Sequence, residues 1–243
     1  MKFIKSLAVK KFREREGLFI AEGEKIVSEL TRSPFNIHAL YYVEGSTNES
    51  LFLNRSINLY PISESELKKI SLLETPNKVL AVAEIPENKF ELETSKNNLT
   101  LMLDGVQDPG NMGTILRTAD WFGIKNIICS VETVDVFNPK VVQASMGSLF
   151  RMKVYYYDLE KILIEIKNQM PVYAAVTDGE NIRNKKLTDK SILLLGNESK
   201  GIKKELLQYA DEKISIPSGK DSKAESLNVA VSSAILLYEL LKY

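Results

Sequence analysis

The sequence predicts an α/β protein in which a small α/β part precedes a parallel sheet with helices on both faces. After residue 99, short apolar runs of strand length alternate with helical patterns, an order typical of a parallel sheet. Helix boundaries agree, because Asn138-Pro139 places a capping residue before a helix and Gly123 stands where another helix should stop. Residues 84–98 are polar and charged, which is typical of a linker.

This linker divides the chain into two expected domains, residues 1–98 with the linker included and residues 99–243. The first domain mixes helix and strand patterns. Apolar residues have helical spacing over residues 22–30. Ser63 and Glu66 form a capping-box pattern before another helix. Strands are expected in two further places, residues 39–43 and 79–83.

The second domain contains apolar runs that predict parallel strands. These runs are residues 99–103, 126–129, 153–156, 172–176, 192–195 and 212–216. A helix is expected to begin near Asn111 or Met112, with Asn111 as its N-cap. The last helix, over residues 228–241 with Ser226 as a candidate cap, has apolar residues on more than one stripe. It is therefore either deeply buried or shared with a second subunit.

Overall charge does not indicate a nucleic-acid-binding protein. The 243 residues include 32 Lys and Arg and 32 Asp and Glu, so the net charge is zero, and 44% are hydrophobic, enough for a packed core. Residues 2–15, however, carry six positive charges against one negative charge. This segment is either a solvated face or an arm that contacts phosphates.

The chain has a single cysteine, Cys129, and a single histidine, His38. These counts exclude an intrachain disulfide and deprive a zinc site of its usual ligands, so we expect no metal. Cys129 lies in an apolar run and is expected in the core, whereas His38 is expected to be partly buried and structural. Low cysteine use and the lack of a membrane-length apolar stretch favour a soluble, cytoplasmic protein with no membrane partner.

Three polar segments lie where predicted strands end or predicted helices begin. They are residues 111–120, 195–201, and 216–217 with 226–231. Arg117 falls opposite the apolar side of its helix, so it is either a surface arginine or faces a cleft at the end of the sheet. Glu198 stands between Gly196 and Gly201, in either an ordinary turn or a loop that approaches a ligand.

In this order, the three segments resemble the SpoU (TrmH) family of RNA ribose 2′-O-methyltransferases, within the SPOUT superfamily. The resemblance implies a trefoil-knotted sheet, S-adenosyl-L-methionine as cofactor, RNA as substrate, and a homodimer formed through the C-terminal domain. The first domain resembles that family's substrate-binding domain, related to small ribosomal RNA-binding proteins, at residues 11–13, 18–20 and 22–23. Ribosomal RNA is expected rather than transfer RNA.

The resemblance also implies site residues. The catalytic set is Asn111, Arg117, Glu198, Ser226 and Asn228. The cofactor-binding set is Leu195, Gly196, Asn197, Gly201, Ile216, Leu227, Asn228 and Val229. Arg117 would grip an RNA phosphate and orient or help deprotonate the hydroxyl, while Glu198 would brace the site by pairing with Arg117. The sequence departs from the family pattern at Ser199 and at Ser218. It also departs in the loop over residues 219–225, which is about two residues longer than the family's loop.

Other functions remain open at this point. A related enzyme could methylate a base nitrogen with Asp104 or Asp108 as general base. The same scaffold could instead be an RNA-binding protein without catalytic activity. A nucleotide-using α/β enzyme unrelated to RNA is disfavoured, because the chain lacks a phosphate-loop motif and spare histidines.

Overall fold

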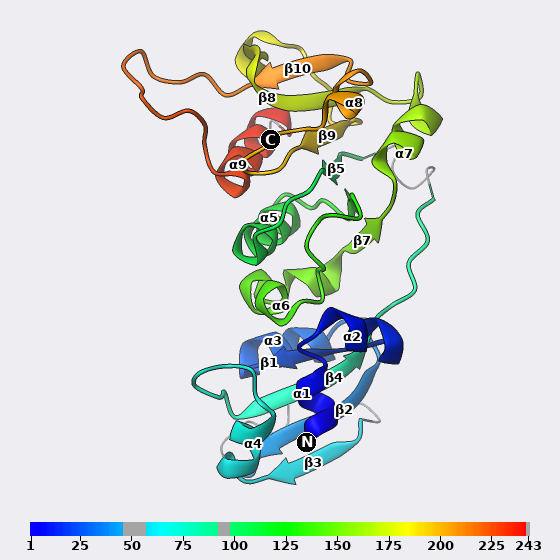
Figure 1. Ribbon diagram of the computed structural model, residues 1–243, viewed down its shortest axis with the longest axis vertical. Helices are drawn as coiled ribbons and strands as arrows, with labels where there is room; N and C mark the ends of the chain where they lie inside the picture. Colours follow the sequence, from blue (N-terminus) through cyan, green and yellow to red (C-terminus); the bar gives the residue numbers. More distant parts are fainter. Residues whose placement is uncertain (46–56, 92–97, 242–243) are drawn as a thin grey trace. The chain divides into compact units, whose positions relative to one another are not determined.

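The computed structural model describes residues 1–45, 57–91 and 98–241. They form two compact units, one made of Met1–Glu87 with Asp135–Arg151, the other of Asn88–Val134 with Met152–Tyr243 (Figure 1). A segment from the middle of the chain thus packs with the N-terminal part. The functional division expected at residue 98 stays a prediction.

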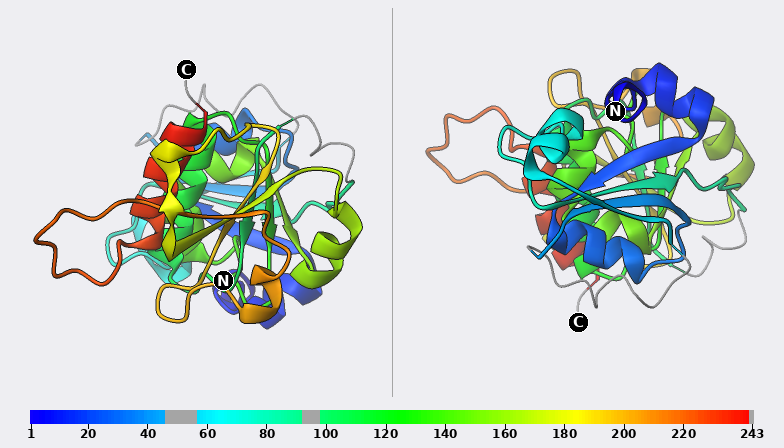
Figure 2. Two further views of the ribbon diagram at one scale, coloured as in Figure 1. Left: turned by 90° about the horizontal axis from the view of Figure 1, so that it is seen from above. Right: turned by 90° about the horizontal axis from the view of Figure 1, so that it is seen from below.

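The first unit is built on a four-stranded mixed sheet. Its strand order is β1 (Leu18–Glu22), β4 (Val79–Glu84), β2 (Ile37–Val43) and β3 (Leu59–Ile62). One face carries α1 (Lys2–Ser6) and α4 (Glu64–Ile70), and the other carries α3 (Glu24–Thr31), as Figure 2 shows from below. Two of these strands and the Ser63–Glu66 capping box were predicted, and the box is confirmed. Strand β1 was not predicted, since all five of its side chains are buried and show no alternation.

A buried arginine joins the middle segment to this unit. Arg13, in α2 (Lys10–Glu16), is only 1% exposed and donates to Asp135 Oδ2 from Nε at 3.0 Å and from Nη2 at 2.5 Å. Its Nη1 donates to the carbonyl oxygens of Leu7 and Ala8 at 2.8 Å each. Arg13 is therefore structural and cannot contact phosphates. Five basic residues of this segment remain exposed: Lys2, Lys5, Lys10, Lys11 and Arg15.

The middle segment contains α6 (Pro139–Ser145), capped by Asn138 as predicted, and the 3-10 helix η3 (Ser148–Arg151). Its Phe137 and Phe150 rings lie 4.8 and 6.2 Å from the ring of Phe19, which belongs to β1. Aromatic packing and the Arg13–Asp135 ion pair thus hold the same segment.

The second unit is a six-stranded, wholly parallel sheet. Its strand order is β10 (Glu212–Ser215), β8 (Val172–Asn181), β9 (Ile192–Leu195), β5 (Thr100–Leu103), β6 (Asn126–Cys129) and β7 (Lys153–Tyr156). Helices α5 (Pro109–Trp121) and α9 (Val229–Leu240) pack together on one face, and α7 (Leu159–Ile166) with α8 (Lys204–Leu207) covers the other (Figure 2). The predicted fold class is confirmed.

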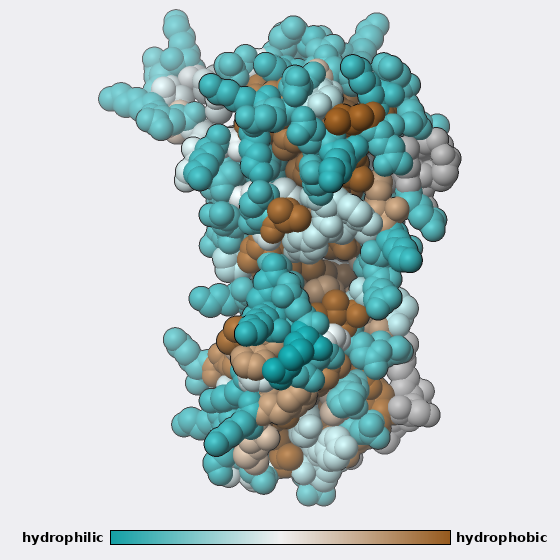
Figure 3. Space-filling model, turned by 45° about the vertical axis from the view of Figure 1, so that its right-hand side comes forward, coloured by the Kyte–Doolittle hydropathy of each residue, from teal (hydrophilic) through white to brown (hydrophobic). Residues whose placement is uncertain are grey.

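Both N-caps predicted in this unit were wrong, although α5 does stop just before Gly123 as predicted. Helix α5 begins at Pro109, and its N-cap is Asp108 rather than Asn111. Helix α9 is capped by Asn228 rather than Ser226, with Asn228 Oδ1 accepting from the main-chain N–H of Ala230 and Val231. An N-cap is the residue immediately before the first residue with helical backbone angles. In both helices this residue differs from the one chosen from the sequence pattern. Hydrophilic side chains cover most of the face shown in Figure 3, since the apolar residues of both units fill their cores.

Candidate functional site

The loop after β9 is tightly closed on itself. Asn197 and Gly201 exchange two main-chain hydrogen bonds of 3.0 Å. A side chain at Gly196 would collide with the main chain of Gly201 and Ile202, so only glycine fits there. The glycines of the second segment therefore shape the loop over residues 196–202.

The Asn197 side chain fixes this loop from within. Its Oδ1 accepts from the main-chain N–H of Ser199 at 2.9 Å and of Lys200 at 3.0 Å. Its Nδ2 donates to the carbonyl oxygen of Gly105, just after β5, at 2.7 Å. The loop is thus anchored to the segment that follows β5 before any ligand binds.

Side chains from all three polar segments meet in one hydrogen-bonded chain. Asn111 Nδ2 donates to Glu198 Oε1 at 2.9 Å, and Asn228 Nδ2 donates to Asn111 Oδ1 at 2.8 Å. The Glu198 carboxylate also accepts from the main-chain N–H of Gln107 and Asp108 at 3.4 Å each. The structure therefore brings together three of the five catalytic residues that the resemblance implies.

The other two catalytic candidates lie outside this chain of hydrogen bonds. Arg117 is exposed, opposite the fully buried Ile115 and Leu116, as the helical wheel predicts. The expected pairing of Arg117 with Glu198 is absent, because Glu198 is bound to Asn111 and to main-chain amides instead. Ser226 is exposed in the loop before α9, which projects from the unit in Figure 1.

A cavity of about 930 Å³ lies in the second unit, between the loops after β9 and β10 and the start of α9. Its lining includes every predicted cofactor residue except Asn228, whose neighbours Leu227 and Val229 line it. The predicted residues that line it are Leu195, Gly196, Asn197, Gly201, Ile216, Leu227 and Val229, joined by Glu198 and Ser226. Apolar side chains such as Ile202 and Leu236 alternate with hydroxyls and main-chain groups, a lining suited to a ligand with apolar and polar parts.

Sequence reasoning missed one wall of this cavity. Residues 175–178 of β8 line it, although they were expected to end or follow a short strand. The pairing explains the difference: Lys213 of β10 pairs with Ala174, but the next residue, Ile214, pairs with Glu180, so the intervening part of β8 bulges out. Gly179 permits this approach, because a Cβ there would lie 2.7 Å from the Ile214 carbonyl carbon. Gly179 was the only hint in the sequence.

The carboxyl end of β5 carries a buried acid. Asp104 is 1% exposed, and its Oδ2 accepts from the main-chain N–H of Lys203 at 2.8 Å. The Lys203 ammonium lies 3.6 Å from Asp104 Oδ1 and 3.0 Å from Glu132 Oε1. The hydrogen bond to Glu132 raises the pKa of Lys203, and the same bond lowers the pKa of Glu132. Lys203 and Glu132 are therefore both charged at neutral pH.

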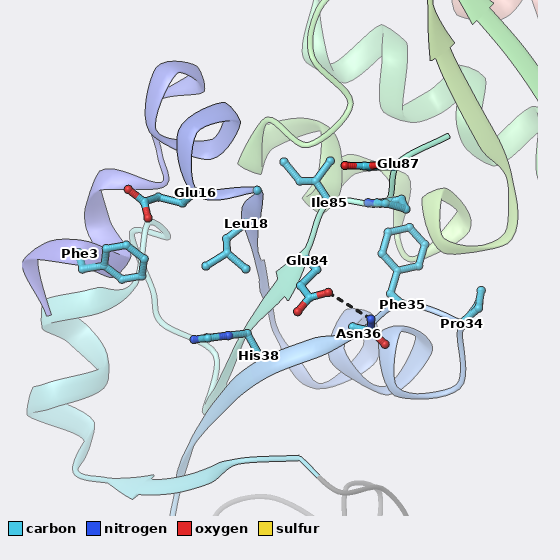
Figure 4. A pocket seen from close by; sticks show the side chains of 12 residues that line it. Phe3, Glu16, Leu18, Pro34, Phe35, Asn36, His38, Glu84, Ile85 and Glu87 are labelled. Atoms are coloured by element: carbon cyan, nitrogen blue, oxygen red, sulfur yellow. Dashed lines mark hydrogen bonds between the residues drawn. The ribbon is translucent and has the colours of Figure 1, made fainter. Parts of the chain in front are cut away.

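The first unit has a different cavity, of about 700 Å³, with carboxylates in its wall (Figure 4). Glu16 pairs with Arg15, and Glu84 accepts from Asn36 Nδ2 at 3.1 Å. His38 also lines it and is exposed, so the expectation that it is partly buried was wrong. Carboxylates repel RNA phosphates, and none of the predicted site residues lies here.

Three features of the described residues concern a thiol, metal sites and membrane-spanning helices. Cys129 is fully buried in β6, as predicted, and burial raises the pKa of its thiol. Within residues 1–45, 57–91 and 98–241, no group of three or more His, Cys, Asp or Glu could hold a metal ion. No helix in these ranges has the length and apolar character needed to cross a membrane.

Comparison with known proteins agrees with the geometry. The sequence model described as the SpoU rRNA Methylase family matches residues 98–238, and that of the MRM3-like substrate binding domain matches residues 1–81. A relative in Bacillus subtilis, the 23S rRNA (guanosine(2553)-2'-O)-methyltransferase RlmP, is 35% identical over 97% of this chain and 93% of its own.

Two solved structures are similar over almost the whole chain. A TrmH-family protein from Porphyromonas gingivalis is 38% identical with a TM-score of 0.85, covering 98% of this chain and 95% of that one. An AdoMet-bound rRNA methyltransferase from Sinorhizobium meliloti is 30% identical, with a TM-score of 0.85 over 98% of this chain and 92% of that one.

Proposed function

Because this chain belongs to the SpoU rRNA methylase family, we propose that it transfers a methyl group from S-adenosyl-L-methionine to a ribose 2′-hydroxyl of ribosomal RNA. One observation carries the proposal: Asn111, Glu198 and Asn228, from three distant segments, form one hydrogen-bonded chain, and Glu198 lines the cavity. The relative in Bacillus subtilis bears the name of this activity on 23S rRNA, and the structure from Sinorhizobium meliloti contains the cofactor.

The cavity fits the cofactor. Its volume of about 930 Å³ is in the range of small-molecule sites, and its apolar walls suit an adenine ring while its main-chain groups suit polar substituents. We propose that the predicted set of residues binds the cofactor: Leu195, Gly196, Asn197, Gly201, Ile216, Leu227, Asn228 and Val229. The family resemblance places their loops in a trefoil knot. When bound, S-adenosyl-L-methionine supplies an electrophilic methyl group on a sulfonium.

The protein's own residues then position the RNA. The Arg117 guanidinium is exposed and forms no hydrogen bond or ion pair with the part of the chain that the structure describes, so its donors are available to a phosphate. In this proposal Arg117 grips the backbone and orients the ribose hydroxyl, and Ser226 and Asn228 hold the ribose by hydrogen bonds. Glu198 braces Asn111 rather than Arg117. Because arginine stays protonated, positioning is the main contribution.

Methylation of a base nitrogen is less well supported. That reaction needs a free general base, but Asp108 Oδ1 accepts from the Asn111 N–H at 2.7 Å as a helix cap. Asp104 is buried against Lys203. Both acids considered as the general base therefore already accept main-chain hydrogen bonds within the fold. A purely RNA-binding role would leave the Asn111–Glu198–Asn228 chain without a purpose.

We propose further that the protein works as a homodimer through its second unit. Helix α9 buries one stripe against the sheet, yet Val231 is 48% exposed and Tyr238 68% exposed on another stripe. On α5, which packs against α9, Trp121 is 85% exposed. A second copy that covers these side chains would remove apolar surface from water.

We place the enzyme in the cytoplasm, where the rRNA substrate is found.

The decisive experiment is methyl transfer from labelled cofactor to rRNA transcripts, followed by alkaline digestion. A 2′-O-methyl group blocks attack by its own oxygen, so the label should remain in an alkali-resistant dinucleotide. Arg117→Ala should abolish incorporation, whereas Lys125→Ala, at an exposed lysine outside the cavity, should not. Label recovered in single nucleotides would point to base methylation and refute the ribose assignment.

A further inference from the structure

Two consecutive residues just after β5 hold both ends of the loop over residues 196–202, which lines the cavity. At the start of the loop, Asn197 Nδ2 donates to the Gly105 carbonyl oxygen at 2.7 Å. At its end, Lys203 donates its main-chain N–H to Asp104 Oδ2 at 2.8 Å. Neither Asp104 nor Gly105 lines the cavity, so their effect on a ligand must act through the loop.

The Asp104 carboxyl group is buried beside Lys203. The Asp104 side chain is 2% exposed, and its Oδ1 has no hydrogen-bond partner within the described chain. The Lys203 ammonium lies 3.6 Å from this oxygen. A buried carboxylate is costly without such compensation, so Lys203 must stay in place for this arrangement to persist.

Lys203 is itself fixed by the neighbouring loop after β6. Its ammonium lies 3.0 Å from Glu132, and the flanking Ser130 and Thr133 hydroxyls accept from the Gly105 N–H at 3.0 and 3.2 Å. The loops after β5, β6 and β9 are thereby joined at one point. This junction lies at the carboxyl end of the sheet, where α/β proteins bind their ligands.

We propose that Asp104 and Lys203 are positioning residues for cofactor binding, which hold the loop over residues 196–202 in its ligand-ready conformation. The inference rests on the proposed function, since it assigns the cavity to S-adenosyl-L-methionine. The ion pair acts on the loop alone. It should therefore change cofactor affinity and leave Arg117, which lies on α5 outside the loop, undisturbed.

The test compares Lys203→Met with Lys204→Met, an exposed lysine one residue further along. Lys203→Met should raise the dissociation constant for S-adenosyl-L-methionine about 10-fold, the scale of a lost charge-assisted interaction. At saturating cofactor, the KM for RNA should stay near the value for the unaltered protein, because Arg117 lies outside the loop. Lys203→Arg should restore most of the affinity, and Lys204→Met should not change it.

Asp104→Asn keeps an oxygen for the Lys203 N–H but removes the charge, and it should weaken cofactor binding in the same way. Because Asp104 is buried, Glu132→Gln provides a surface variant that loosens Lys203 without touching the core. Thermal unfolding is measured on each variant, so that loss of folding is distinguished from loss of affinity.

Hydrogen exchange of the loop amides gives a readout that needs no cofactor. In Lys203→Met, amides of residues 197–202 should exchange faster than in Lys204→Met, while those of β5 should not. Unaltered protein that fails to bind the cofactor would refute the proposed function, and exchange would still test the positioning role. Equal affinity and equal exchange in the two lysine variants would overturn the inference.

Discussion

Asn228 performs two roles with one side chain, and two substitutions can separate them. Its Oδ1 caps α9 by accepting from the N–H of Ala230 and Val231 at 2.9 and 3.3 Å. Its Nδ2 donates to Asn111 at 2.8 Å. Asn228→Ala removes both functions, whereas Asn228→Asp keeps the cap and loses only the donor.

The two variants should therefore differ in stability. Loss of an asparagine N-cap costs about 1 kcal/mol, so Asn228→Ala should unfold at lower urea concentration. An aspartate at the same position still accepts both N–H groups and adds a negative charge at a helix N-terminus, worth about 0.3–1 kcal/mol. Asn228→Asp should be as stable as the unaltered protein or slightly more stable.

Activity should not follow this order. In Asn228→Asp a carboxylate would face Asn111 Oδ1, and Glu198 already contributes negative charge at 2.9 Å from Asn111 Nδ2. Repulsion would displace Asn111 and disrupt the chain of three side chains. Since a misplacement of about 1 Å can cost about 100-fold in rate, both variants should lose methyl transfer to that extent.

The assay pairs urea unfolding with initial rates of methyl incorporation into rRNA. A stable Asn228→Asp protein that retained the normal rate would show that the bond to Asn111 is not needed for the reaction. Equal destabilisation of the two variants would refute the capping argument. Either result would contradict the dual role of Asn228.

Three further predictions concern other parts of the molecule. Asp135→Ala leaves the buried Arg13 guanidinium unpaired and should cost about 3–5 kcal/mol in urea unfolding; a loss below 1 kcal/mol would contradict the role of this ion pair. Burial raises the pKa of Glu22 above 4.5, so its contribution to stability is present below pH 4.5 and is lost as pH rises through the raised value. The free energy of unfolding relative to Glu22→Gln should fall over this window, and a pH-independent difference would count against it. Trp121→Glu should shift the sedimentation of a dimer towards a monomer with unchanged circular dichroism; an unchanged sedimentation coefficient would remove α5 from the interface.

Prediction from sequence succeeded where local pattern decides the structure. Strands β6, β7 and β9 have the predicted bounds, because each is a short run in which β-branched, aromatic or other apolar residues predominate. It failed where a distant partner decides. The bulge of β8 exists because β10 pairs with its two ends, and Gly179 permits this register without specifying it.

The same distinction applies to Asn111. A helix-start asparagine is most simply a cap, but Pro109 is preorganised for the first helical position and moves the start of α5 forward, so Asp108 becomes the cap. Asp108 Oδ1 then accepts the Asn111 N–H at 2.7 Å, which leaves the Asn111 side chain without a capping role. That amide instead bonds Glu198 and Asn228, which lie 87 and 117 residues away in sequence. Because Asp108 and Pro109 form the start of the helix, the Asn111 side chain is not needed as a cap. It is therefore available to the site, although a local rule would have assigned it to the helix.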